Sequence, residues 1–216
     1  MNREMTLSSS ITSSYTTQSN VTTKDIGELK SEIIRKAIHF LIALAPSMAA
    51  INKTATVAFL LIGTLGYTLM EYLRLAGIKV PVISSITSMA SRQRNFNRFE
   101  IGPITLGFGA LLALLLYPSE AAAIAIYALA FGDGVASLAG KFFGKIRPVF
   151  FFGKSIEGSL ACFIAVFISA YTISGSMYIA FIAAFTAMAV EALPLGDYDN
   201  LAIPVAVGLI VHIAVF

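Results

Sequence analysis

The chain has 216 residues, of which 57% are hydrophobic and 12% are charged, and its net charge is +3. Soluble domains carry about 25% charged residues, so this composition excludes an ordinary soluble protein and predicts a polytopic membrane protein. The length allows one membrane domain of six or seven spans. Long basic tracts interleaved with aromatic residues are absent from the sequence, which argues against nucleic acid as a partner.

The amino-terminal part is polar. Residues 1–24 are rich in Ser and Thr and contain no apolar run, so we expect a disordered tail there. From residue 25 to residue 36, apolar side chains fall on one helical face, which predicts an amphipathic segment on the membrane surface. The remaining chain, residues 25–216, is predicted to form a single transmembrane domain.

Apolar runs dominate the rest of the sequence and predict an all-α transmembrane bundle of about seven spans. Asn52 and Lys53 form a predicted tight turn between the first two runs. Several runs are shorter than the roughly 20 residues that a straight span needs, so their ends are approximate. The predicted spans cover residues 33–51, 54–73, 104–117, 121–143, 158–173, 177–192 and 201–216.

The charges are distributed unevenly between the two sides of the predicted bundle. With the amino terminus in the cytoplasm, every Lys and Arg except Lys53 falls on the cytoplasmic side. Every acidic residue except Glu120 then lies on that side or at its boundary. A channel would spread polar groups along a pore, whereas this pattern predicts a polar site at the cytoplasmic surface.

Residues 132–159 combine small, acidic and basic residues directly after an apolar run. Gly132, Ala136, Gly140 and Gly144 recur every fourth residue, so on a helix they form one stripe that another backbone or a phosphate can approach closely. Taken alone, the glycines are typical of helix packing.

Asp133, Ser137, Lys141 and Lys145 run beside this stripe on the same four-residue step. An isolated carboxylate at membrane depth is costly, and a divalent cation would remove that cost. Packing does not require a buried carboxylate, so Asp133 is the first candidate for a functional residue.

Further along, Lys154 and Ser155 stand where a helix is predicted to begin, followed by Glu157 and Gly158. An ammonium group beside free backbone N–H groups can bind phosphate. The neighbouring triplet resembles a P-loop, but Pro148 occupies the position of the first glycine and no strand precedes it, so we reject that motif. The basic loops that contain Arg98 and Lys154 would concentrate an anionic substrate such as a nucleotide, unless they serve only to orient the chain.

Residues 191–204 contain a helix break followed by oxygen-bearing side chains. Asp197, Asp199 and Asn200 offer the hard ligands that Mg²⁺ prefers when it also binds substrate phosphates. An acidic turn exposed to water is the alternative.

Six short motifs occur in the order found in one family, and together they span residues 33–204. The motifs are Arg35-Lys36-x-x-His39, Glu71-x-x-Arg74, Arg98-x-Glu100, Gly132-Asp133-x-x-Ala136-Ser137, Lys154-Ser155-x-Glu157-Gly158-Ser159 and Asp199-Asn200-Leu201-x-Ile203-Pro204. The chain therefore resembles the polyprenol kinases, which include dolichol kinase, phytol kinase and the CTP-dependent diacylglycerol kinase.

This resemblance implies an integral membrane kinase that transfers the terminal phosphate of CTP, or of another nucleotide such as ATP, to a lipid alcohol with Mg²⁺ or another divalent cation. The catalytic residues would be Asp133, Lys154 and Glu157, with Glu100 as a second carboxylate for the hydroxyl proton. Phosphate-binding residues would be Gly132, Ser137, Gly140, Lys141, Gly144, Ser155, Gly158 and Arg98. Metal ligands would be Asp133, Asp197, Asp199 and Asn200. Supporting residues would be Arg35, Lys36, His39, Glu71, Arg74, Glu100 and Glu191. The alcohol would enter from the bilayer along the small-residue stripe.

Two other functions remain open. The related CDP-lipid synthases carry a PGHGG-x-x-DR-x-D signature that this sequence lacks, which favours a kinase over a cytidylyltransferase. A transporter that uses Asp133 as a coupling site should show paired half-repeats, and the sequence offers one interrupted segment without a convincing partner. The oligomeric state is open, a homodimer included.

Overall fold

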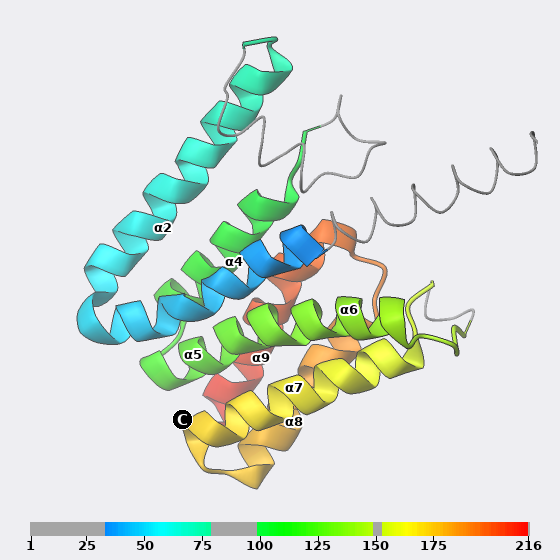
Figure 1. Cartoon of the computed structure of the whole chain (residues 1–216). Coiled ribbons are helices and arrows are strands. Elements are labelled where there is room, and N and C mark those ends of the chain that lie inside the picture. Colours follow the sequence, from blue (N-terminus) through cyan, green and yellow to red (C-terminus); the bar gives the residue numbers. More distant parts are fainter. Residues whose placement is uncertain (1–32, 79–98, 149–152, 216) are drawn as a thin grey trace, which may run out of the picture.

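The computed structural model describes residues 33–78, 99–148 and 153–215 (Figure 1). All regular secondary structure in these ranges is helical, which confirms the predicted all-α fold. The predicted tail, residues 1–24, lies outside the described residues, as does Arg98.

Within the described ranges, four helical segments are long and apolar enough to cross a membrane. They are Ile33–Leu75, Ser119–Phe142, Ile156–Ser174 and Gly196–Val215. Gly102–Leu116 and Met177–Glu191 are shorter apolar helices. The protein is therefore an integral membrane protein, and its predicted orientation stays a prediction.

The first two predicted spans form one bent helical segment. Residues 33–41 are helical and continue through η1 (Ile42–Leu44) into α2 (Ala45–Leu75). Asn52 breaks α2 with φ −154° and ψ 99°, and its Oδ1 accepts a hydrogen bond of 3.0 Å from the backbone N–H of Ala55. An Asn side chain placed in this way caps the start of a new helix, so the predicted turn at Asn52 is confirmed. The two arms diverge from this bend (Figure 1).

One continuous rod passes through the middle of the bundle (Figure 1). It consists of α5 (Ser119–Tyr127), the π-helical turn η2 (Ala128–Asp133) and α6 (Gly134–Phe142), preceded by α4 (Gly102–Leu116). The continuation of the fourth predicted span through Asp133 is thereby confirmed. π-Helical turns are rare and frequently lie at functional sites, and this one ends on Asp133.

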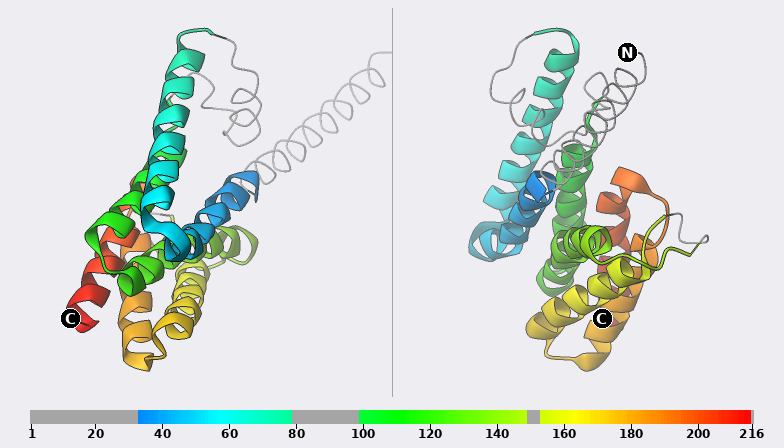
Figure 2. Two further views of the ribbon diagram at one scale, coloured as in Figure 1. Left: turned by 90° about the vertical axis from the view of Figure 1, so that its left-hand side faces the viewer. Right: turned by 45° about the vertical axis from the view of Figure 1, so that its right-hand side comes forward.

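The carboxyl-terminal half comprises α7 (Ile156–Ser174), α8 (Met177–Glu191), η4 (Gly196–Tyr198) and α9 (Asp199–Val215). Ser155 caps α7 by accepting a hydrogen bond from Gly158 N–H, and Gly175 ends it with φ +63°. Helix α7 packs against α6 and α8, whereas α9 packs against α4, α5 and α8 (Figure 2).

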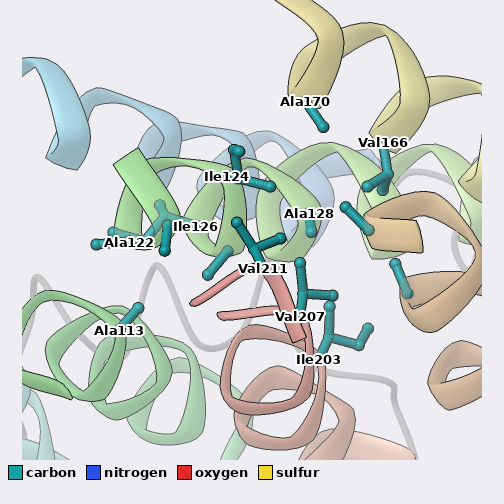
Figure 3. Packing of buried hydrophobic residues seen from close by; sticks show 14 of the residues in the cluster. Ala113, Ala122, Ile124, Ile126, Ala128, Val166, Ala170, Ile203, Val207 and Val211 are labelled. Atoms are coloured by element: carbon teal, nitrogen blue, oxygen red, sulfur yellow. The ribbon is translucent and has the colours of Figure 1, made fainter. Parts of the chain in front are cut away.

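The rod supplies the centre of the apolar core. Ile124 and Ile126 of α5 are fully buried, and they belong to one apolar cluster with Val166 of α7 and with Val207 and Val211 of α9 (Figure 3). The exterior of the bundle is also apolar. Exposed side chains such as those of Ile62, Phe59, Ile168, Phe185 and Ile213 suit contact with lipid rather than water.

The small-residue stripe packs against α7. A Cβ atom added at Gly132 would lie 2.8 Å from Val166 Cγ2, and one added at Gly158 would lie 2.8 Å from the Ala136 carbonyl oxygen. Such distances leave no room for a side chain between the two helices. At Gly132 the stripe therefore serves helix packing. This is the role that the glycines, taken alone, indicated in the sequence.

Gly109 allows the same close approach between α4 and α9, and this placement can be tested. A Cβ atom at Gly109 would overlap the backbone oxygen of Asn200, whereas one at Gly63 on α2 would meet no atom within 4 Å. Gly109→Ala should lower the free energy of unfolding by about 1–3 kcal/mol because the helices must separate. Gly63→Ala should leave it unchanged or raise it by up to about 1 kcal/mol, since Ala favours the helix. Thermal unfolding in detergent measures both variants, and equal melting temperatures would contradict the packing of α4 on α9.

Candidate active site

A pocket of about 700 Å³ lies between the residue 33–41 helix, α4, α6 and the beginnings of α7 and α9. Most of the predicted site residues line it, although they come from separate parts of the chain. The predicted residues that line the pocket are Arg35, Lys36, His39, Glu100, Asp133, Ser137, Gly140, Lys141, Lys154, Ser155, Gly158, Glu191, Asp197, Asp199 and Asn200. The fold therefore gathers acidic and basic side chains around one cavity.

Among the described residues, five predicted site residues do not line this pocket: Gly132, Gly144, Glu157, Glu71 and Arg74. Gly132 lies against α7, and Gly144 lies against the Gly140 carbonyl and the side chain of Ser155. Glu157 accepts hydrogen bonds from the backbone N–H groups of Lys145 (3.0 Å) and Ile146 (3.1 Å) and so holds the chain that follows α6. Its predicted catalytic role stays a prediction.

Glu71 and Arg74 form a buried pair beside the pocket rather than within it. The Arg74 guanidinium donates two hydrogen bonds to the Glu71 carboxylate, at 2.9 Å and 2.8 Å. Glu71 is fully buried and also accepts a hydrogen bond of 2.9 Å from the backbone N–H of Glu100. The pair therefore attaches the residues just before α4 to α2. This contact positions Glu100 at the pocket.

Asp133 is one of three buried carboxylates, with Glu191 and Asp199, that line the cavity. Its Oδ2 lies 2.5 Å from Lys36 Nζ and 3.3 Å from His39 Nε2, and all three side chains are at least nine-tenths buried. Lys36 and His39 are one turn apart on the residue 33–41 helix, so one helix face supplies both contacts. We expected a bound cation to balance this carboxylate, but the protein itself supplies a counter-charge in Lys36.

His39 also anchors the π-helical turn. Its Nε2 lies 2.9 Å from the carbonyl oxygen of Leu129, which belongs to η2. A ring N–H that donates to this oxygen satisfies a buried backbone acceptor and fixes the amino-terminal helix against η2. His39 was predicted as a supporting residue, and its bond to a backbone carbonyl is not visible in the sequence.

Gly134, at the beginning of α6, lets the residue 33–41 helix lie close to α6. A Cβ atom added there would lie 2.5 Å from the Phe40 ring, which in turn lies 6.1 Å from the ring of Phe131, centroid to centroid. The residue 33–41 helix can therefore approach near enough for Lys36 to reach Asp133.

A second charged group lies on the opposite side of the pocket. Lys154 Nζ is 3.1 Å from Glu191 Oε1 and 3.7 Å from Asp199 Oδ2, and it also donates to the Glu191 backbone carbonyl. Ser159 Oγ donates a 3.1 Å hydrogen bond to the other oxygen of Glu191. Glu191 ends α8, so Lys154 sits where a helix carboxyl terminus favours a cation.

Arg147 connects the end of α6 to the turn before α7. Its guanidinium donates to the backbone oxygens of Gly153 at 2.6 Å and Gly140 at 2.8 Å. It also lines the pocket, as do Tyr67 and Leu41. The sequence predicted a basic loop here but did not distinguish Arg147 within it, and no pattern in the sequence indicated Tyr67 or Leu41.

The donor set around the pocket suits a cation that is shared with phosphate. Among the described residues, no three His, Cys, Asp or Glu side chains form a group that could hold a metal by themselves. Asp133 and Asp199 nevertheless line one cavity, from η2 and α9. Mg²⁺ commonly binds one or two carboxylates together with substrate phosphates and water, so these residues fit it. Asn200 Nδ2 donates to Gly102 and Thr105 of α4, so its amide also holds α4 to α9.

Comparison with known proteins finds a distant likeness to a phytol kinase. It is 32% identical to a phytol kinase of Synechocystis sp. over 143 residues, which cover 61% of this chain and 59% of that protein. It is 27% identical to an uncharacterized protein of Methanocaldococcus jannaschii over 186 residues, which cover 84% of this chain and 93% of that protein. No protein-family model and no solved structure matches the sequence. The chain is thus a membrane protein with a distant likeness to a lipid kinase.

The pairing of Asp133 with Lys36 leads to a stability prediction. Asp133→Asn removes the counter-charge and leaves a buried ammonium group, so the free energy of unfolding should fall by roughly 3–5 kcal/mol. Adding Lys36→Met to this variant removes the stranded charge and should restore most of the loss. Thermal unfolding of the purified protein without nucleotide or metal measures both. A single variant as stable as the wild type would contradict a buried pair.

Proposed function

We propose that this protein is an integral membrane kinase that transfers the terminal phosphate of a nucleotide to an isoprenoid alcohol, with CTP the favoured donor and ATP the alternative. The observation that carries the proposal is the pocket itself, where Asp133, Lys154 and Asp199 line one cavity with further cations. This cavity lies among helices that can cross a membrane, so a water-soluble phosphate donor and a lipid acceptor can meet there.

In the proposed reaction, the hydroxyl oxygen of the alcohol attacks the terminal phosphorus of the nucleotide. The bond from that phosphorus to the bridging oxygen breaks, and the electron pair stays on the departing nucleoside diphosphate. The hydroxyl proton passes to a carboxylate or to water, which leaves a lipid monophosphate. Of the two carboxylates predicted for this step, Glu100 lines the pocket and Glu157 does not.

Most of the catalysis would be electrostatic, because phosphoryl transfer depends chiefly on positioning and on stabilising the negative charge of the phosphates. Lys154 would contact the transferred group, since Glu191 and Asp199 already hold its ammonium group at the pocket. Arg147 and Lys141 line the same cavity and would contact the remaining phosphates. Ser155 and Gly158 begin α7, whose free N–H groups favour an anion.

Asp133 and Asp199 would hold the divalent cation. When bound, the cation would neutralise charge on the phosphates and fix their orientation. Lys36 would remain beside Asp133 and hold its carboxylate in place. The likeness to a phytol kinase supports a lipid acceptor, and the chain length and saturation of the alcohol are left open.

The proposal is tested with purified protein, labelled CTP or ATP, Mg²⁺ and a panel of prenols and diacylglycerol. We expect lipid monophosphate and nucleoside diphosphate as products, resolved by chromatography. Lys154→Gln and Asp133→Asn/Lys36→Met should each reduce turnover on the order of 10²-fold or more, because the first removes a cation for the phosphates and the second removes a carboxylate for the divalent cation. Formation of CDP-lipid and pyrophosphate would instead identify a cytidylyltransferase, and absence of any lipid product would overturn the proposal.

We further propose that the pocket faces the cytoplasm, based on the distribution of Lys and Arg. A cysteine placed at Asp197, which lines the pocket, should react with an impermeant thiol reagent only from the cytoplasmic side. A cysteine placed at Lys53, beside the bend in α2, should react only from the other side. Cys162 is buried and gives a low background. If the cysteine at position 197 reacts from the outside, the proposed orientation is wrong.

A further inference from the structure

The charged pocket has an apolar wall. Ile38 and Leu41 of the residue 33–41 helix, Tyr67 of α2 and Leu106 of α4 line the same cavity as Asp133. We propose that this wall receives the hydrocarbon chain of the acceptor alcohol, which enters from the bilayer between the two arms of the bent amino-terminal segment. The inference rests on the proposed function, because it assigns a path to the lipid substrate of that reaction.

The wall and the polar part of the site are continuous on one helix. Lys36 contacts Asp133, and Leu41 follows Lys36 by five residues, which is about 7.5 Å along a helix axis. A chain lying against Ile38 and Leu41 would therefore leave its terminal hydroxyl beside Lys36 and Asp133. The polar end of the cavity binds the reacting groups, while the apolar end keeps the hydrocarbon out of water.

The small-residue stripe is filled at its beginning and meets the pocket further along. A Cβ atom added at Gly132 would lie 2.8 Å from Val166, so α7 leaves no room for a hydrocarbon chain there. Gly140 lines the pocket beside Lys141, Ser155 and Gly158, so the stripe reaches the cavity at its charged part. Entry of the alcohol along the stripe stays a prediction, and the apolar wall is the path that we propose instead.

The wall also continues onto the lipid-facing exterior. The Leu41 side chain lines the pocket and is 62% exposed, so it stands at the rim. The next exposed residue along that segment, Leu44, is 58% exposed, and Leu65 and Leu69 of α2 are exposed as well. Both views in Figure 2 show α2 diverging from the residue 33–41 helix, with α4 beside them. An alcohol in the bilayer can thus reach the wall without crossing water.

Leu41 and Leu44 provide a matched pair of variants for the kinetic test. Both are exposed on the same segment, but only Leu41 lines the pocket. Leu41→Asn should raise the KM for a twenty-carbon prenol about five- to tenfold, because a polar side chain replaces part of the apolar wall. The KM for the nucleotide should not change. Leu44→Asn should leave both values as in the wild type.

A second measurement locates the chain directly. A prenol with a diazirine on its hydrocarbon chain is photolysed with the membrane-embedded protein, and labelled peptides are identified by mass spectrometry. Labelling at residues 38–41 and 103–106 should be abolished by excess unlabelled prenol, whereas labelling at Leu44 should persist because it reports ordinary lipid contact.

The possible outcomes distinguish an error in the proposed lipid path from an error in the proposed kinase function. If the wild type phosphorylates prenols but Leu41→Asn behaves like Leu44→Asn, the path is wrong and the kinase proposal stands. Competable labelling confined to residues 132–144 or 158–166 would likewise overturn the path. A wild-type protein that phosphorylates no alcohol would overturn both proposals.

Discussion

The contact between Asp133 and Lys36 is the interaction on which the arrangement of this protein depends. A carboxylate in an apolar bundle needs a compensating charge, because transfer of an isolated ion out of water is prohibitively costly. Lys36 provides that charge from a helix 97 residues earlier in the sequence. The pair therefore fixes the amino-terminal helix across the π-helical turn. Once that helix is in place, its other side chains form one side of the pocket.

The central rod uses its faces for different purposes. Gly132 lets α7 approach, whereas Asp133, Ser137, Gly140 and Lys141 line the cavity. This separation follows from helix geometry, since residues four apart share a face and neighbouring residues do not. Tight packing on one face makes the other face rigid. Rigid placement is what electrostatic catalysis requires, because groups that need not reorganise stabilise charge most effectively.

The sequence predicted the helices well and the contacts between them less well. Apolar runs mark helices in a membrane protein because every backbone polar group must be satisfied within the segment, and Asn52 marked the bend by its capping chemistry. Residues such as Asp133 and Lys154 stood out because charges are rare in such a chain. The partnership of Lys36 with Asp133 depends on tertiary packing between distant segments, so neither residue type nor spacing reveals it. The π-helical turn is equally hidden, since it is a local shift of hydrogen bonds without a distinctive composition.

The small-residue stripe illustrates the same limit. A stripe of glycines offers space only if no other helix fills it, and the sequence does not say which helix will. Here Val166 of α7 fills the space beside Gly132, whereas Gly140 lines the pocket. Leu41 and Tyr67, which form part of the apolar wall, look in the sequence like any other residues of an apolar span. In a membrane bundle the rare charges therefore indicate where a site lies, whereas the apolar residues that complete it are set by tertiary packing.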